Sequence, residues 1–461
     1  MSSEGDNRGE KSVNWPDAGE QRPLTSVSTR QQHIAEMAKK YAGSPLTTLS
    51  HHLDLLWLRE AYGRVRRDSA PGVDGQTVAD YGENLEANLR DLLERAKSGR
   101  YRAPLVKRVH IPKSETETRP IGMPTVENKV LERAVVMLLE PVYEREFLDC
   151  SFGFRPGRSA HQALDAVRGA VMAMGGGWVL DVDVRKYFDT IPHQKLREVL
   201  GLRIRDGVIG RLVGKWLKAG IWEAGQVTYP ESGTPQGGVI SPMLSNIYLH
   251  EVLDGWFEGT IKPGLLGRAD LIRFADDFVV ICEKREDAEA LLAQVTERFQ
   301  SYGLTIHPEK TRIVDFRPPW KGGGKTQTFD FLGFTHYWGK TRGGGYAMKS
   351  RTRGKKSRAA LREIGEWCKR NRHAPMEKQH RTLSEKVRGH YAYYGIRGNH
   401  RALACFCFRA TQRWHYWLSR RSREGINPGR LWRLLDEHFR LPAARIVHMA
   451  SGRQLTWSLQ T

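Results

Sequence analysis

The stretch that decides the fold is LIRFADDFVVIC, residues 271–282, in which two adjacent carboxylates, Asp276 and Asp277, interrupt an apolar run. Strand-forming residues on both sides of the pair predict a β-hairpin that turns at the aspartates. In an ordinary surface turn such a pair is common and carries no meaning. Packed against a sheet, two carboxylates are costly without a counter-charge, and a hard divalent cation that prefers oxygen ligands would supply one.

A third carboxylate is available from WVLDVDVRKYFD, residues 178–189. The apolar start of this segment predicts a buried strand, along which Asp181 and Asp183 share one face. If the two strand regions are neighbours, which spacing alone does not establish, Asp183 meets the Asp276–Asp277 turn. Three carboxylates around two Mg²⁺ ions, about 3.5–4 Å apart, suit phosphoryl transfer, because the ions stabilise the attacking and leaving oxygens together.

The positive charge of the chain is concentrated in its last quarter. The net charge is +21, and residues 341–461 contain 27 Lys+Arg against 7 Asp+Glu, whereas residues 1–340 contain 46 against 45. Cations for phosphates beside rings that stack on bases favour nucleic-acid binding over a generic solvated basic surface. The rings interleaved with this charge are Tyr391, Tyr393, Tyr394, Trp414, Tyr416, Trp417 and Trp432.

Composition also disfavours several classes of protein. No stretch approaches the roughly 18 consecutive apolar residues of a membrane span. The N-terminus, MSSEGDNRGEKSVNWPD, has no apolar core of a secretory signal, so we expect no membrane partner and a cytoplasmic location. The five cysteines include no CxxC pattern, which argues against a disulfide framework or a zinc site.

The segments on either side of the two acidic stretches have their own patterns of secondary structure. Residues 1–50 show no sustained periodicity and predict a poorly ordered extension. Apolar periodicity predicts helices at 53–67, 80–98, 126–149, 193–218, 239–258 and 286–301. Strands are expected at 107–111 and 329–336, with a short one near Thr305. Beyond the glycines at 343–345, the basic segment predicts helices at 355–371, 378–394, 401–421 and 429–439.

Sequence blocks around these segments make a family recognisable. From about Leu53 to His448 the chain resembles the reverse transcriptase/maturase proteins encoded by bacterial group II introns. The blocks stand in the family's order: SAPGVDG (69–75), IPK…RPIGMPT (111–125), SFGFRPGRSAHQAL (151–164), DVDVRKYFD (181–189), GTPQGGVISPMLSNIYL (233–249), RFADDFVV (273–280), FDFLGF (329–334), RGHYAYYGI (388–396) and WHYWLSRRS (414–422).

The resemblance implies a right-hand polymerase of the α+β class. Residues 51–345 would form the fingers and palm with antiparallel sheet, and residues 346–461 a basic helical thumb/maturase domain. Such a protein is an RNA-directed DNA polymerase that extends a primer 3′-hydroxyl with dNTPs on an RNA template, using two Mg²⁺ ions. It also binds group II intron RNA as a splicing maturase, and its primer can come from target DNA.

The family's catalytic, metal-binding aspartates fall on Asp183, Asp276 and Asp277, which leaves Asp181 as a neighbour. Five further positions match residues that bind the incoming nucleotide: two cations for the triphosphate, a ring below the sugar, and a glutamine and glycine beside the template. They are Lys113, Arg119, Phe188, Gln236 and Gly237. Without the resemblance, these residues read as exposed cations, a core ring and an ordinary turn.

Nucleic-acid contacts are implied for five residues, one after the palm helix and four in the thumb: Lys310, Arg388, Tyr394, Arg420 and Arg421. The chain departs from the family at Phe274, where a tyrosine is usual. It also contains no paired cysteines of the zinc-dependent endonuclease found in many relatives, so we expect no target-strand cleavage.

Two alternatives stay open. One is a non-catalytic RNA-binding splicing factor with a decayed polymerase domain, although all three aspartates and the matching Lys113, Arg119 and Gln236 are retained. The other is a domesticated or retron-like reverse transcriptase, which would keep the enzyme and change its biological context.

Overall fold

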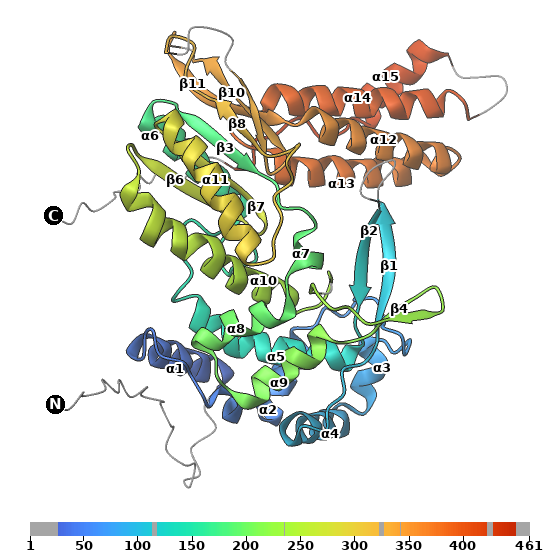
Figure 1. Ribbon diagram of the computed structural model, residues 1–461. Helices are drawn as coiled ribbons and strands as arrows, with labels where there is room; N and C mark the ends of the chain where they lie inside the picture. Colours follow the sequence, from blue (N-terminus) through green and yellow to red (C-terminus); the bar gives the residue numbers. More distant parts are fainter. Residues whose placement is uncertain are drawn as a thin grey trace, which may run out of the picture.

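The computed structural model describes residues 26–112, 118–234, 236–321, 327–341, 343–421 and 427–448. These residues form a helical layer, three β-sheets and a projecting helical bundle (Figure 1). Buried apolar side chains fall into three clusters. The first joins the helical layer to one face of the central sheet, the second covers the other face of that sheet, and the third belongs to the bundle. None of the described helices is both long and apolar enough to cross a membrane.

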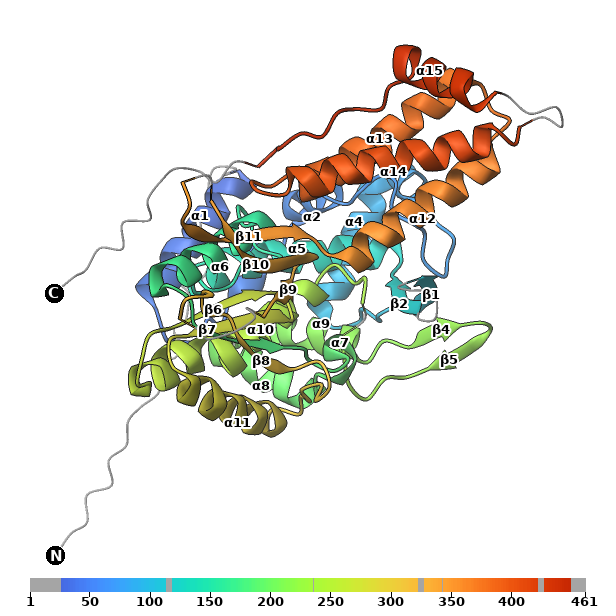
Figure 2. The same cartoon turned by 90° about the horizontal axis from the view of Figure 1, so that it is seen from above.

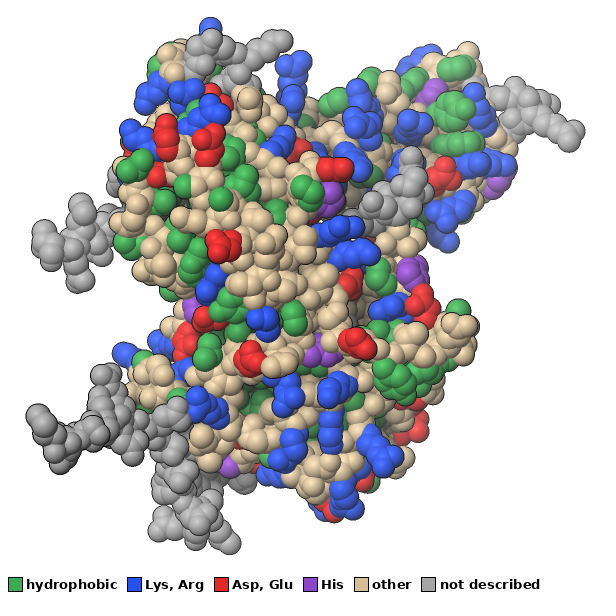
Figure 3. Space-filling view, viewed as in Figure 1, with side chains coloured by type: hydrophobic (Ala, Val, Ile, Leu, Met, Phe, Trp, Pro, Cys, Tyr) green, Lys and Arg blue, Asp and Glu red, His purple; other side chains and the backbone are tan. Residues whose placement is uncertain are grey.

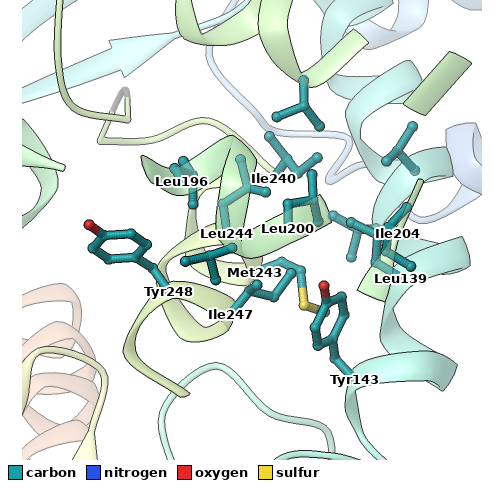
Figure 4. Close-up of a cluster of buried hydrophobic side chains, with 14 of the residues drawn as sticks. Leu139, Tyr143, Leu196, Leu200, Ile204, Ile240, Met243, Leu244, Ile247 and Tyr248 are labelled. Carbon is teal, nitrogen blue, oxygen red and sulfur yellow. The ribbon is translucent and has the colours of Figure 1, made fainter. Parts of the chain in front are cut away.

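The helical layer is organised around α5 (Val126–Tyr143), which is buried along almost its whole length. The other helices of the layer are α1 (Val27–Lys40), η1 (Leu49–His52), α2 (Leu55–Gly63), α3 (Val78–Glu83), α4 (Leu85–Ser98), α8 (His193–Arg203) and α9 (Gly207–Leu217). Trp57 on α2 is fully buried and donates from its indole nitrogen to the carbonyl of Ala134 at 2.9 Å. Figure 4 shows how Leu139 of α5, Leu200 of α8 and Met243 of α10 (Ser241–Leu249) meet in this core.

Helix α1 corrects the expectation that residues 1–50 are poorly ordered. Its N-terminus is capped by the Ser26 side chain, and Val27, Ile34 and Ala38 are buried. Gln31 donates to the carbonyl of Met137 on α5 at 3.0 Å. The few apolar residues of α1 lie in a polar sequence, so their helical spacing is a weak signal. Residues 1–25 lie outside the described residues.

The first sheet has the strand order β2-β1-β4-β5. Its strands are β1 (Val106–Pro112), β2 (Thr118–Met123), β4 (Ile221–Glu223) and β5 (Gln226–Thr228). The sequence predicted only β1, because β4 and β5 are three residues long and β2 contains Pro120 and Gly122, which disfavour a strand. The hairpin of β4 and β5 extends away from the body (Figure 2).

The central sheet is antiparallel, with the order β6-β7-β3-β8. Its strands are β3 (Trp178–Val182), β6 (Ala269–Phe274), β7 (Asp277–Cys282) and β8 (Arg312–Asp315). Successive side chains point to opposite faces: Leu180 packs with α11 (Arg285–Ser301), whereas Val179 packs with α6 (Ala160–Met174). The hairpin and β3 were predicted; β8 was missed, and only an isolated bridge between Val184 and Ile306 stands where a strand near Thr305 was expected.

The helix predicted at 239–258 is interrupted. Helix α10 ends at Leu249 and continues as two π-helical segments, η2 (His250–Asp254) and η3 (Phe257–Ile261), followed by η4 (Lys262–Gly264). Such π-segments are rare and frequently lie at functional sites. Here the first of them places Asp254 in the protein interior.

A three-stranded sheet of β9 (Phe329–Phe331), β10 (Phe334–Lys340) and β11 (Tyr346–Thr352) links the central sheet to the bundle. The bundle consists of α12 (Gly354–Asn371), α13 (Met376–Tyr394), α14 (His400–Leu418) and α15 (Pro428–His438), close to the predicted ranges. One expectation is wrong: Trp414 and Tyr391 are buried core residues, and Trp414 donates to Gln379 at 2.8 Å. These two rings are therefore not available to stack on bases.

Candidate functional site

The acidic pair occupies the turn of the β6–β7 hairpin, as the sequence predicted. Phe274 pairs with Asp277, so Ala275 and Asp276 form a two-residue connection. Ala275 has φ +58°, a left-handed conformation that costs a non-glycine residue about 1–2 kcal/mol. Strain of this kind persists only where the surrounding structure holds it, and it is concentrated at functional sites.

Strand β3 lies beside β7, which brings Asp183 to the same end of the sheet. The antiparallel register pairs Val182 with Phe278, and Asp183 is one position beyond this pair, next to Asp277. The backbone of Asp183 is fixed on its other side, because its carbonyl accepts from the His307 amide at 2.8 Å and its amide donates to the Thr311 hydroxyl at 3.3 Å. The structure therefore places Asp183 beside the Asp276–Asp277 turn, which spacing alone could not establish.

The carboxylates perturb one another. The pKa of Asp277 is raised to about 7, first by burial and then by the negative charges of Asp181, Asp276 and Asp183, although its side chain reaches solvent. Burial also raises the pKa of Asp276. Burial raises the pKa of Asp181 to about 6, although the nearby Arg312 opposes this shift. A site in which ionised carboxylates destabilise each other has an electrostatic need for a cation.

Three basic side chains act on this acidic group, two of them by direct ion pairs. The Lys310 ammonium is 3.6 Å from Asp183, and Arg312 is 3.3 Å from Asp181. The exposed Arg119 on β2 is close enough for its charge to lower the pKa of Asp276. Arg119 thus acts electrostatically on the acidic site, and Lys310 pairs with one of the aspartates themselves.

The donor chemistry fits Mg²⁺, because the convergent groups are carboxylate oxygens that repel one another. Within the described residues, however, no group of three or more His, Cys, Asp or Glu side chains is arranged to hold a metal ion. The strand register brings the aspartates together without forming a closed coordination set.

The loop that precedes α10 closes another side of the site. The carbonyl of Gln236 accepts from the amide of Gly122 on β2. Gly237 has φ +110°, and a Cβ there would lie 2.3 Å from the Gly122 carbonyl oxygen, so only glycine fits. These contacts link Gln236 and Gly237 to the strand that carries Arg119. Lys113 lies outside the described residues.

Phe188 lies on a short helix, α7 (Tyr187–Thr190), beyond the end of strand β3. The chain leaves β3 through Lys186, whose φ is +47°. The ring of Phe188 is half-buried and packs edge-on against Tyr187 at 5.4 Å between centroids, while its carbonyl accepts from the Thr234 amide at 2.7 Å. One edge of the ring is therefore fixed by the core.

A second turn meets the acidic one from the three-stranded sheet. The backbone of Leu332, between β9 and β10, hydrogen-bonds the Asp277 carboxylate. Tyr393 of α13 donates to the Leu332 carbonyl at 2.8 Å, and Tyr394 packs against Phe334 at 5.2 Å. Tyr394 thus helps to join the bundle to the sheet. Sequence reasoning missed Tyr393 as a support of the site, although its block had been recognised.

Comparisons with known proteins agree with this arrangement. The family model for reverse transcriptase (RNA-dependent DNA polymerase) matches residues 111–336, which include all three aspartates. "Protein YkfC" of Escherichia coli (strain K12) is 33% identical over 325 residues, covering 61% of this chain and 84% of that protein. The chain belongs to the reverse transcriptase family.

Proteins encoded in introns are among its relatives. "Group II intron-encoded protein LtrA" of Lactococcus lactis is 40% identical over 186 residues, which cover 40% of this chain and 30% of that protein. "Putative COX1/OXI3 intron 1 protein" of Saccharomyces cerevisiae is 26% identical over 326 residues, or 60% of this chain and 38% of that protein. The matched part is thus about a third of the length of these intron-encoded relatives.

The bundle contains the remaining residues that were predicted to contact nucleic acid. Arg388 is exposed on α13, and the guanidinium of Arg420 lies 3.7 Å from the centre of the Tyr416 ring. Arg421 donates to the His373 carbonyl at 3.1 Å, so part of its hydrogen-bonding capacity is used within the protein. Lys and Arg side chains predominate over acidic ones on the face of the bundle shown in Figure 3.

Sequence reasoning also missed Glu132, a fully enclosed carboxylate on α5. It accepts from the amides of Val239 and Ile240 at 2.6 and 3.1 Å, and from Asn128 at 2.9 Å. Glu132 therefore holds the start of α10 just after the Gln236–Gly237 loop. An acidic residue within an apolar helical stretch was the one available signal, and its partner lies 107 residues away.

Proposed function

We propose that this protein is an RNA-directed DNA polymerase that extends a primer 3′-hydroxyl with dNTPs on an RNA template. The observation that carries the proposal is the convergence of Asp183 with the Asp276–Asp277 turn, next to Arg119 and Lys310, in a chain of the reverse transcriptase family. Two carboxylate-bearing strands and nearby cations are what a site for triphosphate and primer requires.

The proposed architecture is a right-hand polymerase. The helical layer and the first sheet would be the fingers, the central sheet with β9 and β10 the palm, and the bundle from about residue 346 the thumb. Since α1 packs against α5, we assign residues 26–50 to the fingers. The template–primer duplex would then lie between the fingers and the thumb, against the palm.

In the proposed reaction Asp183, Asp276 and Asp277 would hold two Mg²⁺ ions. When bound, these ions activate the primer hydroxyl and stabilise the charge on the leaving pyrophosphate. Arg119, with Lys113, grips the triphosphate through charge-assisted hydrogen bonds. Phe188 blocks a ribose 2′-hydroxyl, and the backbone at Gln236–Gly237 lies against the nucleotide and template.

We further propose that the bundle binds group II intron RNA and so supports splicing. Its outer helices carry stacked rings, with Trp432 4.7 Å from His415 and 6.4 Å from Phe408. Exposed arginines flank these rings at Arg409, Arg430 and Arg433. Rings and cations of this kind bind phosphates and unpaired bases without using a catalytic residue.

Primer extension tests the proposal. Purified protein, an RNA template and an annealed DNA primer should give extension with Mg²⁺ and none with EDTA. The variant Asp276→Asn with Asp277→Asn should lose incorporation by at least about 10³-fold, while its RNA affinity is unchanged. The charge-matched control Asp91→Asn with Glu94→Gln, on the exposed face of α4, should extend normally.

Two results would contradict the proposal. Full extension by the double aspartate variant would remove the assignment of the site. RNA binding by the wild-type protein with no extension under any divalent ion would favour the non-catalytic splicing factor.

A further inference from the structure

Beneath the acidic turn lies an ion pair that has no contact with solvent. Arg273 and Asp254 are both 0% exposed, and the guanidinium makes a two-pronged contact with the carboxylate, with Nε donating to Oδ1 at 2.7 Å and Nη2 to Oδ2. Arg273 belongs to β6, two residues before Ala275, whereas Asp254 belongs to the π-helical segment η2. The pair therefore links the irregular end of α10 to the catalytic hairpin.

The remaining donors of Arg273 are all used. Nη1 donates to Asn246 Oδ1 at 3.0 Å and to the carbonyl of Ala275 at 3.0 Å, and Nη2 donates to Ser151 Oγ at 2.8 Å. The bond to Ala275 reaches the residue with left-handed φ, directly before Asp276. One rigid, planar group thus fixes the strained turn from below.

A second element holds the same turn from the side. Residues 150–153 run along β6: the Arg273 amide donates to the Cys150 carbonyl at 2.8 Å, and the Phe152 amide donates to the Arg273 carbonyl at 2.9 Å. Gly153 then passes so close to the turn that a Cβ on it would lie 2.3 Å from the Ala275 nitrogen. Asn246 donates to the Gly153 carbonyl at 2.6 Å, so both supports meet at one side chain.

Stability alone does not explain the buried pair of Arg273 and Asp254. Replacing a buried ion pair with packed apolar residues is often neutral or stabilising, so such a pair is weak evidence of a stabilising role. What apolar residues could not supply here is the hydrogen bond to the Ala275 carbonyl and a fixed position for the turn.

We propose that Arg273, Asp254, Asn246 and Gly153 form a bracket that positions the Ala275–Asp276 turn, and with it both aspartates of the hairpin, for catalysis. These four are positioning residues, since none of them is placed to touch the primer, the nucleotide or the ions. The inference rests on the proposed function for its effect on rate, but the position of the turn can be measured separately.

The main test removes the pair without leaving a lone buried charge. The variant Arg273→Met with Asp254→Leu should fold and keep the wild-type affinity for template–primer. Its kcat should fall roughly 10- to 100-fold, because small displacements of catalytic groups cost that much, and its half-saturating Mg²⁺ concentration should rise. Arg273→Lys, which keeps the charge and loses the planar fork, should show the same kcat loss.

A pair of glycine variants gives a test that leaves all charges in place. Gly153→Ala should lower kcat because the added Cβ displaces the turn. Gly169→Ala, on the exposed side of α6 with no atom near the added Cβ, is the matched control and should keep the wild-type rate.

Hydrogen exchange of the peptide covering residues 269–282 measures the turn directly. The Arg273→Met, Asp254→Leu protein should exchange faster there than the wild type, and equally elsewhere. A folded double variant with wild-type exchange, kcat and Mg²⁺ requirement would overturn the bracket. The wild-type protein could also fail to extend a primer while the double variant still exchanges faster at the turn. That result would overturn the proposed polymerase activity but not the bracket.

Discussion

The acidic turn and the helical bundle place charge in opposite ways. At the turn a few carboxylates are fixed by backbone register, and their environment shifts the pKa of Asp277 to about 7. On the bundle, arginines such as Arg409 and Arg433 stand exposed on helix surfaces, and neither forms an ion pair with another described residue. The first region depends on the position of each group, the second on the sum of its charges.

This difference predicts where a single substitution should have a large effect on activity or on RNA affinity. Transition-state stabilisation needs donors and ions held in place, so one displaced carboxylate removes most of the rate. Binding to a polyanion releases counterions roughly in proportion to the number of contacts, so each cation contributes a similar, modest share. Activity should therefore be lost abruptly at the turn and affinity gradually on the bundle.

The largest effect that separates the regions is expected from Arg409→Gln, Arg430→Gln and Arg433→Gln together. Losing three phosphate contacts should weaken RNA affinity roughly 50- to 150-fold at 0.15 M salt and flatten the slope of log affinity against log salt by about 2 to 3. Extension of a short template–primer at saturating concentration should change little. The measurement is fluorescence anisotropy across a salt series.

Its control removes the same charge from the helical layer, at Arg90, Lys97 and Arg211, all of them exposed. If this control weakens RNA binding equally, the bundle has no special role, and net charge alone governs affinity.

A smaller effect should distinguish packing from selection at Phe188. The variant Phe188→Ala keeps the backbone bond to Thr234 but removes a half-buried ring. We expect discrimination between dNTP and rNTP to fall by roughly 10- to 100-fold, with RNA affinity unaltered. Single-nucleotide incorporation with matched dNTP and rNTP measures the ratio. Equal loss of rate for both substrates would mean that the ring only packs.

The two regions should also respond differently to pH. A protonated carboxylate does not bind a cation, so the raised pKa of Asp277 makes the Mg²⁺ requirement depend on pH near neutrality. Half-saturating Mg²⁺ for extension should rise about tenfold from pH 8 to pH 6. RNA affinity should change much less, because arginines stay charged over this range. A Mg²⁺ requirement that is flat with pH would contradict the raised pKa.

The same contrast explains which features of the structure could be predicted from the sequence. The acidic hairpin and the bundle helices were predictable, because apolar residues on both sides of one polar pair and long helical periodicity are local signals. The neighbourhood of Asp183 and Asp277 was anticipated from residue type and resemblance, and it became visible only through the strand register.

What the sequence could not predict depends on partners far along the chain. Arg273 beside an aspartate pair reads as a surface cation, yet it is fully buried because Asp254 and Asn246 arrive from a different helix. Trp414 lies in a basic segment, yet it packs inside the bundle. Short strands such as β4 and β5 are set by pairing and not by propensity.

The smallest expected effect concerns Glu132, a buried charge that supports the site without belonging to it. Burial raises its pKa to about 7, so protonation of this group stabilises the folded protein. This stabilisation is complete below the pKa of about 4.5 in the unfolded chain, and it is lost as pH rises through the folded-state pKa of about 7. Glu132→Gln cannot ionise; its amide oxygen can still accept from Val239 and Ile240, but its amide nitrogen cannot accept from Asn128. The thermal midpoint of the variant should therefore rise relative to that of the wild type by about 5 °C between pH 5 and pH 8. The control Glu94→Gln, on an exposed face of α4, should show no such divergence.

Melting curves of variant and wild type that stay parallel across this pH range would mean that Glu132 is ionised when buried, held by the two amides. The start of α10 would then differ from the acidic turn, where burial and neighbouring negative charges raise the pKa of Asp277.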